Sequence, residues 1–151
     1  MAVESGRVVE VERRIAAPRE EVFAFLTDPD KYTKWMGEAV ELDPRPGGVY
    51  RVRMNSDRVV LGEYVEVDPP SRVVFTWGWE GDGAVPPGST RVEITLREDG
   101  DFTILSLRHT GFTTDGATAS HREGWPMYME RLSVAAPGGD PGPDPTATTH
   151  P

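Results

Sequence analysis

The sequence predicts an α+β fold in which an antiparallel sheet of six to seven strands is covered by one C-terminal helix. Strand-like segments separated by short turns follow one another from residue 59 to residue 112. A segment of helical period then runs from residue 120 to residue 136, where His121, Trp125 and Leu132 recur on one face. Since the sheet and the helix each have an apolar face, burying both faces requires them to pack together.

Seven segments have the alternation or the β-branched composition of strands. In the first, Val9, Val11 and Ile15 alternate with charged residues, which is typical of a half-buried strand. The predicted strands cover residues 7–16, 39–42, 49–54, 59–67, 72–79, 90–97 and 102–110. Clusters of Gly, Pro, Asn, Asp and Ser separate them. Two short helices are predicted after the first strand, one that begins at Pro18 and ends before Asp28, and one over residues 30–36.

The last helix contains two residues that disfavour a regular start. Pro126 removes a backbone hydrogen bond and bends a helix unless it lies in the first turn. Gly124 weakens the same turn. The sequence therefore predicts that the regular helix begins near Gly124, and that residues 115–123 form a looser lead-in or a separate turn.

Composition divides the chain of 151 residues into one folded domain, residues 6–136, and a tail, residues 137–151. The tail has five prolines and three glycines among its fifteen residues, and its largest aliphatic residue is alanine. Such a segment cannot bury enough apolar surface to offset the entropy that is lost on ordering. The sequence therefore predicts a disordered tail after a domain that is large enough for one core.

The charge and composition of the chain exclude several classes of partner and site. The formal net charge is −9, and −7 remains without the two aspartates of the tail. An acidic domain repels phosphates and anionic lipid, so we expect neither a nucleic-acid nor a membrane partner. The chain has no cysteine, no apolar run of spanning length and no secretory signal pattern, which predicts a cytoplasmic protein. It also lacks a glycine-rich phosphate loop, and we expect no cofactor.

Several short patterns match a known family in order and spacing. They are Ala17-Pro18-Arg19-Glu20-Glu21-Val22-Phe23, Lys34-Trp35, Pro46-Gly47-Gly48-Val49-Tyr50, residues 62–77, His109-Thr110-Gly111-Phe112 and Gly124-Trp125. On these patterns, which span residues 8–136, the chain resembles the START-like (SRPBCC) superfamily. Within that superfamily it is similar to the polyketide-cyclase-like group of homologues of the activator of heat-shock protein 90 ATPase.

The resemblance implies a helix-grip fold, in which a curved antiparallel sheet wraps around a long C-terminal helix. It also implies an elongated, mostly apolar cavity between the sheet and that helix. Two departures from the family pattern bear on these implications. Pro126 predicts that the last helix is shorter or kinked, and the further N-terminal domain of the chaperone activator has no counterpart in this sequence. Chaperone stimulation is therefore the less favoured interpretation.

Three polar residues are predicted on otherwise apolar strand faces. Arg13 lies on the apolar face of the first strand, Glu63 on that of residues 59–67, and His109 shares a face with Leu107. Because an isolated buried charge is costly, each of these residues needs a partner, water or a ligand. One interpretation is a polar cluster that orients a ligand or exchanges a proton, with His109 and Glu63 as candidate catalytic residues. The other is an Arg13–Glu63 ion pair and a histidine that ends a strand.

Large aromatic residues on the strands and on the last helix suit a cavity wall, although they also suit a packed core. The candidate ligand-binding residues are Arg13, Tyr50, Glu63, Trp77, Leu107, His109, Trp125, Tyr128 and Met129. A metal site of His109, His121 and Glu63 would lack a close-spaced pair of ligands, so we expect no metal.

The leading functional prediction is a protein that binds a small hydrophobic or aromatic ligand in an internal cavity. One alternative is a cyclase- or dehydratase-type enzyme, in which the cavity positions the substrate and one acid–base residue moves a proton. Another is a chaperone-regulating or other protein-interaction module, which would use an exposed apolar surface. The sequence favours a role other than catalysis, and it leaves homodimerisation through a sheet edge open.

Overall fold

The computed structural model describes residues 7–145 and contains one seven-stranded sheet and three helices. The strands are β1 (Val9–Ile15), β2 (Ala39–Leu42), β3 (Val49–Asn55), β4 (Arg58–Asp68), β5 (Arg72–Trp77), β6 (Thr90–Asp99) and β7 (Phe102–Thr110). The helices are α2 (Arg19–Thr27), α3 (Pro29–Tyr32) and α4 (Asp115–Ala135). All neighbouring strands are antiparallel, in the order β1-β7-β6-β5-β4-β3-β2. The predicted α+β class is confirmed.

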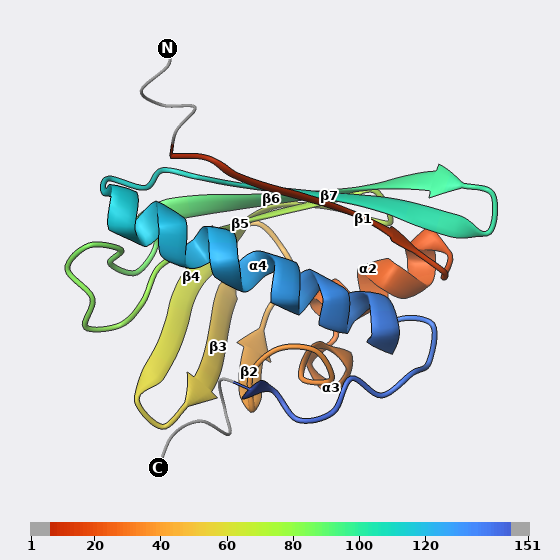
Figure 1. Ribbon diagram of the computed structural model, residues 1–151, viewed down its shortest axis with the longest axis horizontal. Coiled ribbons are helices and arrows are strands. Elements are labelled where there is room, and N and C mark those ends of the chain that lie inside the picture. The colour runs from red at the N-terminus through yellow and green to blue at the C-terminus, as the bar shows by residue number, and fades with distance from the viewer. Residues whose placement is uncertain (1–6, 146–151) are drawn as a thin grey trace.

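The sheet is strongly curved, and α4 lies across one face of it (Figure 1). The strands β1, β6 and β7 run along one side of the helix, whereas β2, β3 and β4 turn away beneath it. The short helices α2 and α3 lie near the C-terminal end of α4. This is the helix-grip arrangement that the resemblance implies, with the core between α4 and the sheet. None of the helices in the described part of the chain has the length and apolar character that a membrane span requires.

The register of β7 brings His109 into the centre of the molecule. This residue is paired with Val9 of β1 and with Val92 of β6, so it has a strand on each side. Leu105, Leu107 and His109 are all buried and alternate with more exposed residues. The predicted face of this strand is therefore confirmed, and it points toward α4.

The helix α4 begins earlier than the sequence predicts. It runs without interruption over Asp115–Ala135, so the prediction of a start near Gly124 is wrong. Its N-terminus is capped by Thr114, whose side-chain oxygen accepts a hydrogen bond from the backbone N–H of Ala117 (3.1 Å). This cap and the packing of the first turns on the sheet outweigh the unfavourable helix propensities of Gly124 and Pro126.

Aromatic residues fill the interior at β3, β4 and β5. The rings of Tyr50 and Phe75 are stacked with centroids 4.1 Å apart, and the Tyr64 ring meets the Tyr50 ring edge-on at 5.8 Å. The hydroxyl groups of Tyr32 and Tyr50 are hydrogen-bonded, and burial raises the pKa of both well above 10.0, so both stay neutral. Because these buried rings occupy this region, the elongated cavity that the resemblance implies is shortened to a smaller pocket.

Residues 137–144 return to the body of the molecule below α4 (Figure 1). The carboxylate of Asp144 is buried and accepts hydrogen bonds from the backbone N–H of Gly37 (2.7 Å) and the hydroxyl of Tyr128 (3.0 Å). The guanidinium of Arg131 donates to the backbone carbonyl oxygens of residues 141, 142 and 143 at 2.9–3.2 Å. These polar contacts correct the prediction of disorder for residues 137–144, because that prediction considered apolar burial alone. Residues 146–151, and residue 6 at the predicted start of the domain, lie outside the described residues.

We expect Asp144→Ala to lower the free energy of unfolding by about 1–3 kcal/mol, because the Gly37 N–H and the Tyr128 hydroxyl lose a buried carboxylate. Asp140→Ala is the matched control, since Asp140 is exposed and accepts its hydrogen bond from Gly142 within the same segment. The control should change stability by less than about 0.5 kcal/mol. Urea denaturation followed by tryptophan fluorescence measures both, and equal effects of the two substitutions would contradict the anchoring role of Asp144.

Candidate functional site

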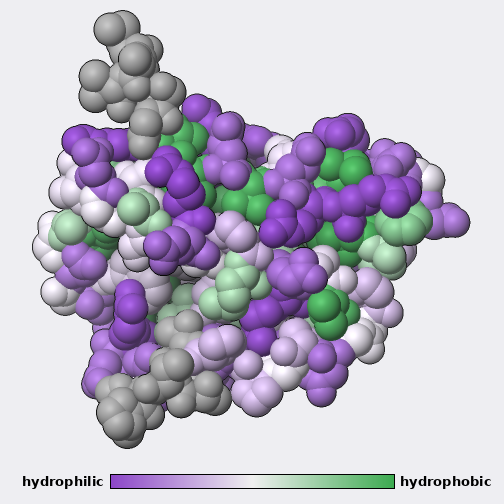
Figure 2. All heavy atoms as spheres, in the orientation of Figure 1, coloured by the Kyte–Doolittle hydropathy of each residue, from purple (hydrophilic) through white to green (hydrophobic). Residues whose placement is uncertain are grey.

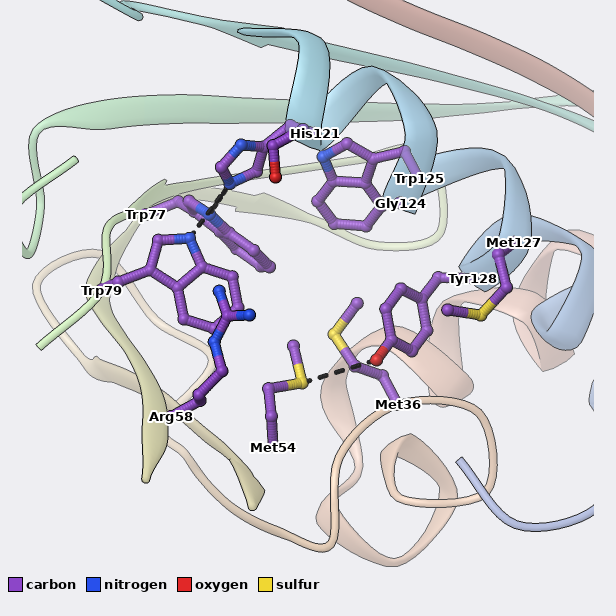
Figure 3. Close-up of a pocket in the computed structure, with 11 residues that line it drawn as sticks. Met36, Met54, Arg58, Trp77, Trp79, His121, Gly124, Trp125, Met127 and Tyr128 are labelled. Atoms are coloured by element: carbon purple, nitrogen blue, oxygen red, sulfur yellow. Dashed lines mark hydrogen bonds between the residues drawn. The ribbon is translucent and has the colours of Figure 1, made fainter. Parts of the chain in front are cut away.

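A pocket of about 130 Å³ opens between α4 and the strands β3, β4 and β5. Its lining residues are Met36, Met54, Arg58, Trp77, Trp79, Ser120, His121, Gly124, Trp125, Met127 and Tyr128. Figure 3 shows these side chains arranged around a central hollow, with His121 and Trp125 projecting from α4 toward Trp77 and Trp79 of the sheet side. Aromatic and methionine side chains make up most of the wall, as is usual for sites that bind small apolar molecules.

The pocket has a buried wall and an exposed mouth. Trp77 and Trp125 are each only 2% exposed, and their ring centroids are 5.1 Å apart. Arg58 and Ser120 are exposed and lie at the mouth. At Gly124 of α4, a Cβ atom added to the backbone would meet no atom within 4 Å. The missing side chain at this helix position therefore contributes to the open space of the pocket.

His109 is held in one protonation state by three consecutive hydrogen bonds. The indole N–H of Trp125 can only donate, so the His109 Nδ1 that it meets at 2.9 Å is the acceptor. The proton of His109 is therefore on Nε2, which donates to Thr90 Oγ1 at 2.8 Å. Thr90 in turn donates to the backbone carbonyl oxygen of Trp77 at 2.6 Å. This chain of hydrogen bonds joins α4 to β7, β6 and β5.

His121 has the opposite tautomer. Its Nδ1 lies 2.8 Å from the carbonyl oxygen of Ala117, which can only accept, so Nδ1 carries the proton. Its Nε2 then accepts from two indole groups, that of Trp77 at 3.2 Å and that of Trp79 at 3.0 Å. An imidazole nitrogen has one lone pair, so the two indole N–H groups share one acceptor.

Burial lowers the pKa of both histidines. The pKa of His109 lies well below 6.5, first because of burial and second because of the neighbouring His121. The pKa of His121 is lowered mainly by burial, which the hydrogen bond to Ala117 partly opposes. Both rings are therefore neutral at pH 7, in agreement with their hydrogen-bond partners. His109 has both ring nitrogens occupied and does not line the pocket, so its geometry does not fit proton exchange with a ligand.

The structure separates the predicted ligand-binding residues into three groups. Trp77, Trp125 and Tyr128 line the pocket. Four others are buried in the core around it: Tyr50, Leu107, His109 and Met129. Arg13 and Glu63 lie elsewhere.

The prediction that Glu63 faces the interior is wrong. Glu63 is exposed, whereas Val60 and Tyr64 of the same strand are buried. A register shift between Tyr64 and Glu66 changes which face is inward along β4, so strict alternation fails there. Glu63 lines a separate shallow depression together with Pro87 and Gly88, among others.

Arg13 is half-buried on the predicted face of β1, but it does not pair with Glu63. Its guanidinium donates to the carbonyl oxygen of Pro126 in α4 (3.4 Å) and lies 3.9 Å from the carboxylate of Glu130. The predicted Arg13–Glu63 ion pair is therefore replaced by contacts between β1 and α4. Arg13 helps to hold the helix and lies outside the pocket.

Of the three residues weighed for a metal site, only the two histidines come together. The ring centroids of His109 and His121 are 5.2 Å apart, while Glu63 faces outward. Within residues 7–145, no cluster of three or more His, Asp or Glu side chains has the geometry of a metal site. The ring nitrogens of both histidines are already engaged in hydrogen bonds.

Several lining residues were missed by sequence reasoning. His121 shares one helix face with Trp125 and Tyr128, and that spacing was a sufficient signal to include it. Arg58 and Trp79 carry no such signal, because each lies next to a strand end where alternation does not fix the direction of the side chain.

The chain matches the family of activator of Hsp90 ATPase homolog 1-like (AHSA1-like) proteins over residues 16–136. It belongs to this family. The match agrees with the resemblance drawn from the short sequence patterns and with the helix-grip fold. No curated protein matches the chain.

Solved structures similar to the chain include an AHSA1-like protein of Rhizobium etli, which is 46% identical with a TM-score of 0.73 over 91% of this chain and 86% of that chain. CalU16 of Micromonospora echinospora is 29% identical with a TM-score of 0.73, over 90% of this chain and 77% of that chain. DynU16, a protein in the dynemicin biosynthetic locus, is 25% identical with a TM-score of 0.78 over 89% of this chain. The match covers 49% of DynU16, so this AHSA1-like chain spans about half of that protein.

We expect stability to fall as the pH drops below 6.5, because the unfolded chain then binds protons that the buried histidines do not. A histidine whose pKa is lowered in the folded state contributes folding stability at pH values above its ordinary pKa of 6.5. That stability is lost as the pH falls. Below pH 6.5, each of the two histidines lowers the free energy of unfolding by up to about 1.4 kcal/mol for each pH unit.

His109→Gln separates this effect from the titration of other groups, because glutamine does not titrate. At pH 8 the variant should be less stable by about 1–3 kcal/mol, since the indole N–H of Trp125 loses its acceptor. At pH 5.5 the difference from the wild type should shrink by about 1.4 kcal/mol. Urea denaturation at the two pH values measures this, and a difference that does not change with pH would contradict a buried, neutral His109.

Proposed function

We propose that this AHSA1-like protein binds a small aromatic molecule in the pocket between α4 and the sheet. The observation that carries the proposal is an open space of about 130 Å³ walled by Trp77, Trp125 and Tyr128. Side chains of this kind supply a large apolar contact area, and indole or phenol rings stack on flat ligands.

The volume limits the ligand to one aromatic ring inside the pocket. An apolar cavity of about 150 Å³ in a protein core is known to accommodate benzene. A larger ligand would have to place the rest of its structure at the mouth, near Arg58 and Ser120. Met36, Met54 and Met127 on the other walls are flexible enough to adapt to rings of different shape.

The geometry favours binding over the catalytic alternative. Among the lining residues, the side chains that can titrate are Arg58, His121 and Tyr128, and none is a carboxylate. His121 uses Nδ1 for Ala117 and Nε2 for the two indoles, so neither nitrogen is free to act as an acid or a base. A cyclase- or dehydratase-type reaction would require such a group.

The surface does not favour the protein-interaction alternative. Within residues 7–145, the exposed large hydrophobic residues are Val65 on β4 and Val134 on α4. On the face shown in Figure 2, the hydrophobic areas are small and separated by hydrophilic ones. A docking surface would instead show one contiguous apolar patch. A cytoplasmic location and dimerisation through a sheet edge stay predictions of the sequence.

The two helical glycines with open space at Cβ allow a direct test of the proposal. Gly124→Leu places an isobutyl group in the pocket, whereas Gly116→Leu places the same group on the exposed first turn of α4. Leucine has the higher helix propensity, by up to about 1 kcal/mol, so neither variant should lose stability through the helix itself.

Binding of benzyl alcohol is measured by two-dimensional amide and indole NMR shifts across a titration. We expect saturable shifts at the indole groups of Trp77 and Trp125 in the wild type and in Gly116→Leu, and none in Gly124→Leu. Circular dichroism and thermal melting confirm that each variant is folded. Equal binding by both variants, or no saturable shifts in the wild type with either benzyl alcohol or benzoate, would overturn the proposal.

A further inference from the structure

The mouth of the pocket carries the positive charge of Arg58. Arg58 begins β4, is exposed and lines the pocket, and no carboxylate of residues 7–145 forms an ion pair with it. On the neighbouring strand β3, Arg51 and Arg53 do have such partners, Glu80 at 4.0 Å and Glu38 at 3.3 Å. Arg58 therefore differs from the arginines next to it in having its charge available to a ligand.

The guanidinium of Arg58 is held in place by an aromatic ring. Its central carbon lies 4.3 Å from the centroid of the Trp79 ring, which is a cation–π contact. In Figure 3 the Arg58 side chain extends beside Trp79 toward the hollow. A planar guanidinium that is fixed in this way can bind both oxygens of a carboxylate.

Trp79 brings a second donor to the same region. Its indole N–H shares the single lone pair of His121 Nε2 with the indole N–H of Trp77. A ligand oxygen near Trp79 can accept from this N–H without leaving His121 unpaired, because Trp77 still donates to it. Trp79 is only half-buried, so such an oxygen can reach it from the mouth.

The charges around the pocket are not all positive. The charge of Arg58 lowers the pKa of His121, and the charge of Asp82 raises it. The effect of Asp82 is the smaller of the two. The Asp82 carboxylate is also engaged, since it accepts from the backbone N–H groups of Ala84 (2.7 Å) and Val85 (3.2 Å). Arg58 belongs to the lining of the pocket and Asp82 does not, so Arg58 is the charged group that a ligand contacts directly.

We propose that the pocket selects aromatic carboxylates, with the ring in the hollow against Trp77 and Trp125 and the carboxylate at the mouth against Arg58 and the indole N–H of Trp79. This inference rests on the proposed function and adds the class of ligand to it. The formal net charge of the chain is −9, so the field of the whole protein disfavours anions. A preference for an anionic ligand must therefore come from local groups.

Two probes of similar size distinguish the contribution of the aromatic ring to binding from the contribution of the carboxylate charge. Benzoate carries the carboxylate, and benzyl alcohol is its uncharged counterpart. In NMR titrations at pH 7 the wild type should bind benzoate about tenfold more tightly than benzyl alcohol, which corresponds to one charge-assisted contact. The indole N–H signal of Trp79, assigned with Trp79→Phe, should shift with benzoate more than with benzyl alcohol.

Arg58→Gln should weaken benzoate binding about tenfold more than it weakens benzyl alcohol binding, so that the preference for benzoate is lost. Arg53→Gln is the matched control, since it removes the same charge from the neighbouring strand outside the pocket, and it should keep the wild-type preference.

Equal affinity of the wild type for the two probes would overturn the inference and leave the proposed function in place. The same conclusion follows if Arg58→Gln weakens both probes alike, or if Arg53→Gln loses the preference as well. Binding of neither probe would overturn the proposed function together with this inference.

Discussion

The position of α4 on the sheet depends on the hydrogen bonds between two neutral histidines and three indole groups. His109 connects Trp125 of the helix to β6 and β5, and His121 of the helix accepts from Trp77 and Trp79. Buried polar groups of this kind are stabilising only when each is satisfied, so a shift of the helix by one turn would leave several of them unpaired. The network therefore fixes one register of helix against sheet.

The same network explains why an open space remains in the core. Trp77 and Trp125 are hydrogen-bonded through their indole nitrogens, so neither ring can rotate into the hollow without losing its partner. At Gly124 the helix has no side chain that would fill it. The opposite wall consists of methionines, whose flexible side chains accept only weak hydrogen bonds at sulfur, Met36 from the Tyr32 hydroxyl (3.8 Å) and Met54 from the Tyr128 hydroxyl (3.7 Å). One wall is rigid and the other adaptable, which suits a site for a flat ring.

The architecture was predictable from the sequence because it follows from local patterns. Alternation in β7 placed His109 toward the interior, and helical spacing placed Trp125 and Tyr128 on one face of the last helix. Those patterns are set by burial on a single face, which periodicity reports directly. The start of α4 was not predictable from propensity, because Gly124 and Pro126 are overridden by a cap and by tertiary packing.

The details of the site depend on features that lie outside periodicity. A register shift in β4 reverses the inward face, so Glu63 was assigned to the wrong side. Arg58 enters the site from a strand end through contact with the Trp79 ring, which is distant in sequence. Likewise, residues 137–144 are ordered by the polar groups of Arg131 and Asp144, and a composition argument based on apolar area does not detect such anchors.

The most direct test of this account is the protonation state of the two histidines, measured by long-range proton–nitrogen NMR correlations at pH 7. We predict two neutral rings of opposite tautomer, with the proton of His109 on Nε2 and that of His121 on Nδ1. A charged ring, the same tautomer at both positions, or averaging between tautomers would contradict the hydrogen-bond network on which the position of α4 and the open pocket depend.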